Sequence, residues 1–457
     1  MDDPRTGLGF WFDSLDTLPP FDLPFWRERV PVAIVGGGYT GLWTAWYLKQ
    51  LEPALDVAVY EAERCGFGAS GRNGGWCLGL AAGLDDVLAD ARTRTRGLAL
   101  ARALFATVDE VGRFCVEQGV DAHFAKGGSL AVATVPFQAE RMQRDVEDRL
   151  RWGLDEDDYR WLPPERARQR IGMQDNHGAL HFRHCAALHP ARLVLGLASA
   201  VQRRGVTVYE ETPVHRIEPG LLTTARGPVR ADVVIRATEG YTPGLTGEAR
   251  RLVPIHSMVT ATEPLPPELW REIGLPNRET FGDWRRVVIY GQRTADDRLV
   301  LGGRGRYYFG SKRLRNVPPD EPRLRRVEAL LPELFPMLKG VRITHRWGGP
   351  MAAQRHWRPG VCFDRRSGLG WAGGYLGEGV AAANLAARIL VDLVLERRTP
   401  LTELPWVGDK ARRWEPEPLR WIGARLLEHA AERADAHEFA SDRPSRLWGR
   451  IFEGMMQ

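Results

Sequence analysis

The chain has 457 residues, which is long for a single hydrophobic core and predicts two or three domains. Its hydrophobic content of 44% is ordinary for a globular protein and excludes general disorder. The 63 basic and 58 acidic residues leave a formal charge of +5, too weak a bias to indicate a nucleic-acid partner. The five cysteines show neither zinc spacing nor a disulfide pattern, so we expect a reducing compartment and no metal site.

The chain carries no recognisable targeting or membrane segment. Its first residues are acidic and lack the apolar run of a secretion signal. No window reaches the roughly eighteen consecutive apolar residues that a membrane helix needs. We therefore expect a soluble, cytoplasmic protein without integral membrane contact.

The first unit along the chain is predicted to be a strand, a helix and a second strand. Residues 32–35 form a β-branched run that is typical of a buried parallel strand. Residues 42–51 have helical spacing, and residues 57–60 again predict a strand. This order is typical of a βαβ unit that binds a dinucleotide.

The turn between the first strand and the helix reads G-x-G-x-x-G. The three glycines permit a tight turn, a close approach of the backbone to a pyrophosphate, and close packing of the helix on its strand. Glu61 ends the second strand, where it can accept hydrogen bonds from ribose hydroxyls and disfavours a 2′-phosphate. The unit therefore predicts NAD or FAD rather than NADP. Its expected cofactor contacts are Gly36, Gly38, Tyr39, Thr40, Gly41, Glu61 and Ala62.

A second glycine cluster, "GASGRNGGW", follows shortly after this unit. FAD is longer than the crevice of one βαβ unit and needs a second contact surface, whereas NAD does not. The cluster therefore favours FAD. Its expected contacts are Ser70, Gly71, Arg72, Asn73, Gly74 and Gly75.

The stretches "AIVGGGYTGLWTAWYL" and "GFGASGRNGGW" resemble the D-amino-acid oxidase (DAO) superfamily of FAD-dependent oxidoreductases, in its γ-glutamylputrescine-oxidase-like branch. The resemblance continues over residues 31–394. It implies an α/β fold with a Rossmann-like FAD-binding domain of the glutathione-reductase type. An inserted α+β substrate domain on a mainly antiparallel sheet is also implied. In the family, the backbone around Val214 covers the adenine, and a strand ending at Ala237 and Thr238 returns over FAD.

Near its C-terminal end the chain again predicts a strand, a glycine loop and a long helix, in "GLGWAGGYLGEGVAAANLAARILVDLVL". The glycines let the backbone approach a flavin, and the helix N-terminus can stabilise negative charge on it. The expected contacts are Gly373, Gly374, Gly377, Gly379 and Val380.

We expect the domains to be discontinuous along the chain. The predicted divisions are an N-terminal extension at 1–29, an FAD-binding domain at 30–100, 185–245 and 345–400, a substrate domain at 101–184 and 246–344, and a helical tail at 401–457. In the tail, Leu419, Ile422, Leu426 and Ala430 fall on one helical face. This face predicts docking on the chain itself or on a second subunit, as in a homodimer.

The chain has one dinucleotide fingerprint, so we expect an organic substrate to supply the electrons. The resemblance implies removal of a hydride from the carbon next to an amine nitrogen, giving an imine and then an aldehyde or ketone. Molecular oxygen would be reduced to H2O2. The alternatives are an amino-acid or N-methyl amino-acid oxidase of the glycine or sarcosine kind, a dehydrogenase with another acceptor, and a flavoprotein without catalytic activity.

Candidate catalytic residues are carried over from the segments that resemble the family, without assignment of a general base: Trp76, Tyr241, His256, Arg304, Tyr375 and Glu378. His256 is equally interpretable as a core histidine, and Trp76 and Tyr375 as packing against the flavin. Arg304 could hold a substrate carboxylate or be one surface arginine among many. Glu378 stands where the family often has histidine, which would favour a cationic substrate or disfavour reduced flavin.

Noncovalent FAD is expected. Family members with covalent flavin carry a cysteine or histidine near the flavin, whereas residues 347–351 contain no thiol and the second glycine cluster contains no histidine. Cys362 is the remaining candidate for attachment, in a different register.

Overall fold

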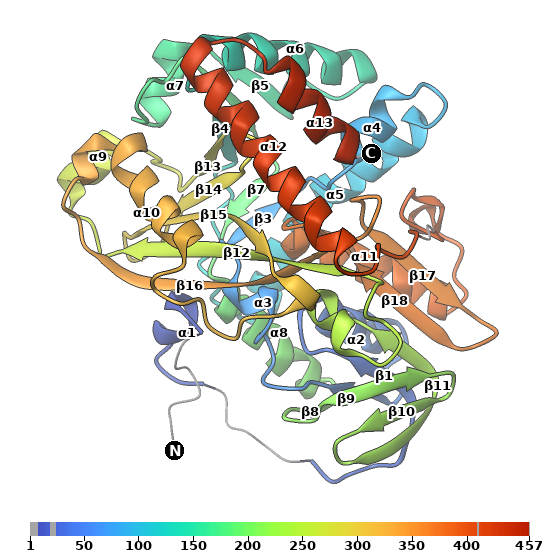
Figure 1. Cartoon of the computed structure of the whole chain (residues 1–457). Helices are drawn as coiled ribbons and strands as arrows, with labels where there is room; N and C mark the ends of the chain where they lie inside the picture. Colours follow the sequence, from blue (N-terminus) through green and yellow to red (C-terminus); the bar gives the residue numbers. More distant parts are fainter. Residues whose placement is uncertain (1–7, 19–23, 409–410, 457) are drawn as a thin grey trace.

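Two eight-stranded sheets form the frame of the molecule (Figure 1). The computed structural model describes residues 8–18, 24–408 and 411–456. The first sheet lies at the bottom of Figure 1 and the second crosses its centre. Because each sheet is built from segments distant in sequence, the chain passes repeatedly between the two.

The first sheet has the order β17-β18-β11-β1-β2-β8, and β9 and β10 extend it from β11. Its central neighbours, from β18 through β11, β1 and β2 to β8, pair in parallel. Parallel strands are buried on both faces, which explains their continuous apolar runs. The strands are β1 (Arg29–Val35), β2 (Val57–Tyr60), β8 (Thr207–Tyr209), β9 (Val214–Glu218), β10 (Leu221–Thr224), β11 (Gly227–Arg236), β17 (Gly360–Asp364) and β18 (Leu369–Gly373).

Three helices cover this sheet and form the largest apolar cluster with it. They are α2 (Tyr39–Leu51), α8 (Pro190–Arg203) and α11 (Gly379–Val394). Leu42, Leu197 and Leu385, one from each helix, are fully buried there with Ile34 of β1. Each such side chain contributes about 1.5–3 kcal/mol when removed from water. This core fixes the glycine turns at both α2 and α11 against the sheet.

The second sheet has the order β16-β12-β15-β14-β13-β4-β6-β5 and is antiparallel throughout except for the parallel pair β13 and β4. The predicted mainly antiparallel sheet is thereby confirmed. Its strands are β4 (Ser129–Val132), β5 (Tyr159–Leu162), β6 (Ala179–Phe182), β12 (Val253–Thr262), β13 (Thr280–Asp283), β14 (Ile289–Arg293), β15 (Leu299–Tyr307) and β16 (Ile343–Ala353).

Strand β16 crosses the domain boundary that we predicted at residue 345. It pairs with β12 along its whole length, so residues as far as Ala353 belong to the second sheet. The sequence segment at this point carries two glycines and a proline, which obscured a strand. The remaining divisions of the chain stay predictions.

The other elements connect or cover these sheets. The two short strands β3 (Trp76–Leu78) and β7 (Cys185–Ala187) pair with each other. The remaining α-helices are α1 (Phe10–Asp13), α3 (Ala69–Arg72), α4 (Leu84–Ala89), α5 (Arg94–Gln118), α6 (Pro136–Trp152), α7 (Pro164–Arg170), α9 (Pro267–Ile273), α10 (Pro322–Leu334), α12 (Leu419–Ser441) and α13 (Arg446–Met456). Among the described residues, every helix is too short or too polar to span a bilayer.

The C-terminal helices α12 and α13 lie side by side across the second sheet, in red in Figure 1. The predicted apolar face of α12 is only partly covered. Ala430 is buried, but Leu419, Ile422 and Leu426 are 60%, 51% and 45% exposed. The described residues therefore leave this end of the face exposed.

Candidate active site

A cavity of about 470 Å³ lies between the carboxyl ends of β1, β2 and β11 and the second sheet. It brings together most of the residues that the sequence singled out. Of the predicted catalytic residues, those on its wall are Trp76, Tyr241, Arg304, Tyr375 and Glu378. Of the predicted cofactor contacts, those on its wall are Gly36, Gly38, Tyr39, Thr40, Glu61, Ala62, Ser70, Arg72, Asn73, Gly74, Val214, Ala237, Thr238, Gly377, Gly379 and Val380.

The start of α2 is open towards this cavity. Its N-cap residue is Gly38, which has no side chain of its own to cap the first turn. A Cβ atom at Gly38 would lie 2.8 Å from the Ser70 hydroxyl oxygen, which itself accepts the Tyr39 N–H at 2.9 Å. Uncapped N–H groups at a helix start are a ready binding site for phosphate. The cradle therefore fits a pyrophosphate that needs bare backbone.

Glu61 closes the adjacent side of the cavity at the end of β2. Its two carboxylate oxygens accept the Gly37 N–H at 2.6 Å and the Glu63 N–H at 3.0 Å. Burial raises the pKa of Glu61 to about 7, although these hydrogen bonds act in the opposite direction. A carboxylate fixed in this position can accept from the hydroxyls of a ribose.

The second glycine cluster is held by Arg72, whose side chain is buried. Its guanidinium donates to the Tyr241 hydroxyl at 2.8 Å and to the Arg315 carbonyl at 2.8 Å. The Asn73 side chain donates to two carbonyls of α3 and accepts the Gly75 N–H at 2.8 Å. Arg72 and Asn73 therefore fix the shape of this wall as well as lining it.

The C-terminal glycine loop is tied to Glu239, which follows β11, and to Thr40 at the start of α2. Glu239 accepts the N–H groups of Gly374 at 2.9 Å and Tyr375 at 3.1 Å, and burial raises its pKa to about 7. The Tyr375 and Thr40 hydroxyls are hydrogen-bonded at 2.9 Å. Glu239 lines the cavity, yet the sequence analysis missed it. Its position directly after Thr238 at a predicted strand end was the available signal.

Glu378 and Arg304 provide opposite charges on one wall. The Oε2 atom of Glu378 is buried and has no hydrogen-bond partner in the described part of the chain. Burial raises the pKa of Glu378 to about 7, and the charge of Arg304 acts in the opposite direction. Burial likewise lowers the pKa of Arg304, opposed by Glu378. Such a pair offers an acceptor to a cation and donors to an anion.

Trp76 of β3 and Tyr290 of the second sheet form an aromatic wall beside the second glycine cluster. Trp76 donates from its indole nitrogen to the Gly291 carbonyl at 3.2 Å, and its ring stands edge-on to Tyr290 at 6.1 Å. The Tyr290 hydroxyl is hydrogen-bonded to the Ser257 hydroxyl at 2.5 Å, and burial raises the Tyr290 pKa to about 12. Sequence reasoning missed Tyr290 and Ser257, because no motif marks them and only the sheet brings them here.

His256 is not on the cavity wall. It is fully buried, and its Nε2 atom accepts the Leu314 N–H at 2.9 Å. This position matches the alternative of a core histidine. The predicted glycine contacts off the wall are Gly41, Gly71, Gly75, Gly373 and Gly374. They serve close packing: a Cβ at Gly41 would lie 2.0 Å from the Gly36 carbonyl oxygen.

One cavity is lined by the start of α2, by Glu61 as an acceptor for ribose, and by two further glycine segments. This combination is typical of a flavoprotein. The family model DAO, described as FAD dependent oxidoreductase, matches residues 31–393. The chain belongs to this family, and its cofactor is FAD. The predicted fold, cofactor and class of oxidoreductase are confirmed.

Relatives agree with this assignment. The chain is 32% identical over 431 residues to the γ-glutamylputrescine oxidoreductase of Escherichia coli K12, covering 91% of this chain and 96% of the relative. Solved structures at 19% identity share the fold. Glycine oxidase from Geobacillus kaustophilus has a TM-score of 0.67, with 82% of this chain and 96% of that chain covered. L-Proline dehydrogenase from P. horikoshii has a TM-score of 0.68, with 83% and 96% covered.

Proposed function

We propose that the protein is an FAD-dependent amine oxidase that oxidises the carbon next to an amine nitrogen to an imine. The observation that carries this proposal is the buried, unpartnered Oε2 atom of Glu378 on the cofactor cavity wall. A buried polar atom without a partner is costly, and a substrate ammonium or amine would satisfy it. The identity to the E. coli relative, whose name specifies an amine substrate, supports the same class.

When bound, FAD would supply the redox chemistry, as acceptor of a hydride from the substrate and donor of two electrons to oxygen, which gives H2O2. The substrate's α-carbon loses this hydride, its nitrogen releases a proton, and water hydrolyses the resulting imine to an aldehyde or ketone. The protein's residues would position these groups. The glycine turns and Glu61 would hold the dinucleotide, Trp76 and Tyr290 would exclude water, and Glu378 would orient the nitrogen.

Arg304 favours a second candidate function. In the described part of the chain, its guanidinium has only the neighbouring charge of Glu378 and no hydrogen-bonded carboxylate. It could therefore bind the carboxylate of an amino acid or N-methyl amino acid, as the names of related structures suggest for glycine. γ-Glutamylputrescine, named in the E. coli relative, carries both a primary amine and a carboxylate. A dehydrogenase using another electron acceptor remains the third option.

Anaerobic reduction separates these options. The FAD-loaded protein is mixed, without air, with alkylamines, γ-glutamylated and free polyamines, and amino acids, and loss of visible flavin absorption is followed. Bleaching by amines, with peroxide formed when air is admitted, supports the amine oxidase. Bleaching by amino acids alone moves the function to the second candidate, and slow reoxidation in air indicates another acceptor. Failure of every compound to bleach the flavin contradicts the proposal.

We propose that FAD is bound noncovalently, since no cysteine or histidine of the described residues lines the cavity. Acid precipitation should release the flavin into the supernatant.

A cytoplasmic location is proposed from the five free cysteines. A homodimer is proposed from the exposed Leu419, Ile422 and Leu426, and its test is the molar mass by light scattering.

A further inference from the structure

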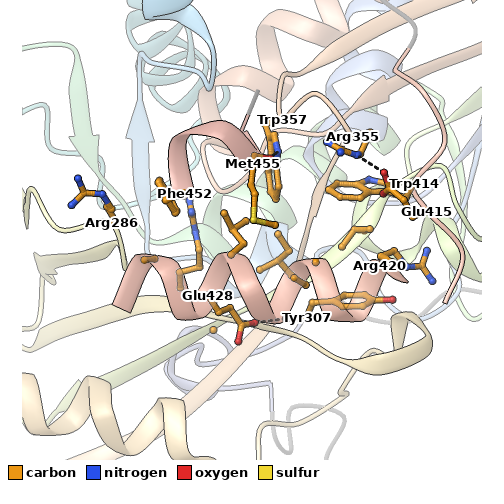
Figure 2. Close-up of a pocket in the computed structure, with 18 of the residues that line it drawn as sticks. Arg286, Tyr307, Arg355, Trp357, Trp414, Glu415, Arg420, Glu428, Phe452 and Met455 are labelled. Carbon is orange, nitrogen blue, oxygen red and sulfur yellow. Dashed lines mark hydrogen bonds and ion pairs between the residues drawn. The ribbon is translucent and has the colours of Figure 1, made fainter. Parts of the chain in front are cut away.

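A second cavity of about 330 Å³ lies beside the cofactor cavity, between the second sheet and the helices α12 and α13. Figure 2 shows the side chains around it: Trp357, Trp414 and Met455 gather on one side of α12, and Tyr307 lies below. We call it the tail chamber. The glycine motifs do not point to it, because its walls come from β12, β15, the C-terminal helices and the loops that carry Trp357 and Trp414.

The walls of the tail chamber are apolar and fixed. The indole rings of Trp357 and Trp414 meet edge-on, with centroids 5.4 Å apart. Both indole N–H groups are already used, by the Met455 carbonyl at 3.2 Å and the Ala353 carbonyl at 3.0 Å. The rings therefore present only carbon to the space between them. Rigid aromatic walls with satisfied polar tips are typical of pockets for apolar groups.

The charged residues around the chamber neutralise one another. Arg355 pairs with Glu415 at 3.0 Å, and Arg323 pairs with Glu428 at 3.4 Å. Arg286 pairs with Glu438 of α12 at 2.7 Å. Because these charges have partners, they leave no demand for a charged ligand inside the chamber. Arg304 is the exception, and it lies at the boundary with the cofactor cavity.

The two cavities share one sheet surface. Arg304 lines both of them, and across the strand pair it faces Ser257, which lines the cofactor cavity. Ile255 lies two residues from Ser257 on β12, and past a register shift between the two strands it is paired with Tyr307; both residues line the tail chamber. Alternate residues of a strand point to the same side. Arg304 therefore stands at the boundary where the two cavities meet.

We infer that the tail chamber binds the apolar distal part of the substrate, so that the preferred substrates are amines carrying an aryl or branched alkyl group several bonds from the reacting carbon. This inference rests on the proposed amine oxidase. The reacting amine would lie at Glu378, and the chain would pass Arg304 into the chamber. A free polyamine fits less well, because its second ammonium would be buried among indole rings without an unpaired carboxylate.

A matched pair of ligands tests this inference on the FAD-loaded protein. Propylamine and 3-phenylpropylamine share the reacting end and differ by a phenyl group. Their saturation constants are measured by anaerobic flavin reduction. The corresponding alcohols, propan-1-ol and 3-phenylpropan-1-ol, are titrated by calorimetry, which requires no turnover. Burial of the phenyl group predicts about tenfold to hundredfold tighter binding of the longer ligand in both measurements.

Gly423→Leu fills the chamber without disturbing the helix. Gly423 lines the chamber within α12, and a Cβ at this position would meet nothing within 4 Å. We expect this variant to lose the advantage of the phenyl ligands and to bind propylamine unchanged. Ala440→Leu, on the exposed side of the same helix, is the control and should behave as wild type. A melting temperature at or above the wild-type value confirms that Gly423→Leu is folded.

The outcomes are distinguishable. If wild type binds the short and the phenyl ligands equally, the inference that the tail chamber binds substrate is wrong, even if both amines reduce the flavin. A phenyl advantage that survives Gly423→Leu also overturns it, because the group must then bind elsewhere. If the phenyl alcohol binds tightly and loses affinity in Gly423→Leu, while no amine reduces the flavin, the chamber stands and the proposed amine oxidation fails.

Discussion

Thr40 and Tyr375 are 335 residues apart in sequence, yet their hydroxyls share a buried hydrogen bond of 2.9 Å. Thr40 stands at the start of α2, and Tyr375 lies in the loop before α11. The bond therefore joins the two helix starts that flank the cofactor cavity. It fixes their separation, and with it the space between the pyrophosphate cradle and the C-terminal glycine loop.

Removing this bond should lower stability modestly and measurably. We expect Tyr375→Phe to reduce the free energy of unfolding by about 1–3 kcal/mol, because the Thr40 hydroxyl is left buried and unpaired. Thr40→Val in the Tyr375→Phe background should cost less than in wild type, giving a coupling energy of about 0.5–1.5 kcal/mol. Urea denaturation, without FAD, measures the free energy of unfolding of wild type, the two single variants and the double variant. Strict additivity of the two substitutions would contradict the role assigned to this bond.

Gly41 should be intolerant of a side chain for a packing reason. A Cβ atom there would lie 2.0 Å from the Gly36 carbonyl oxygen, so Gly41→Ala must displace the turn or the helix. We expect a loss of about 1–3 kcal/mol in the free energy of unfolding and weaker retention of FAD. Gly423→Ala is the matched control, because its Cβ meets nothing and helix propensity predicts a gain of about 0.5–1 kcal/mol. Similar losses in both variants would show that steric contact at Gly41 is not the cause.

Glu378 predicts a pH-dependent difference in stability. Its pKa is raised from 4.5 to about 7 in the folded protein, so the folded state holds a proton that the unfolded state has released. The wild type therefore loses stability as pH rises from about 4.5 to 7. Glu378→Gln keeps the shape of the protonated form and removes this loss. Its stability relative to wild type should increase over that range and stay constant above it. If the stability advantage of Glu378→Gln over wild type shrinks as pH rises, the attraction of Arg304 affects the pKa of Glu378 more than burial does.

Arg304 should discriminate between substrates with and without a carboxylate. If it binds a substrate anion, Arg304→Met should raise KM about tenfold to hundredfold for γ-glutamylated amines, the equivalent of about 1.5–3 kcal/mol for a charged hydrogen bond. Simple alkylamines should be nearly unaffected. Arg304→Lys keeps the charge but not the bidentate geometry, so it should recover part of the loss. Equal effects on both substrate kinds would assign Arg304 to the structure of the wall rather than to recognition.

The sequence by itself determined the dinucleotide unit and the cofactor. Strand 32–35, the three glycines and Glu61 are local, and the backbone geometry they impose depends on residues close together in the chain. The second glycine cluster and the C-terminal loop are equally local motifs. For this reason all predicted cofactor contacts that are not packing glycines appear on the cavity wall.

Tertiary structure alone decided the opposite wall. Tyr290 and Ser257 carry no motif, and they reach the cavity only because strand pairing brings distant segments together. The same holds for the tail chamber, because its walls come from β12, β15 and α12, and no single one of these segments predicts a cavity. Helical spacing predicted that Leu419, Ile422 and Leu426 share a face, but not that this face stays exposed. Periodicity defines which residues lie together on a helix, whereas what covers them depends on long-range packing.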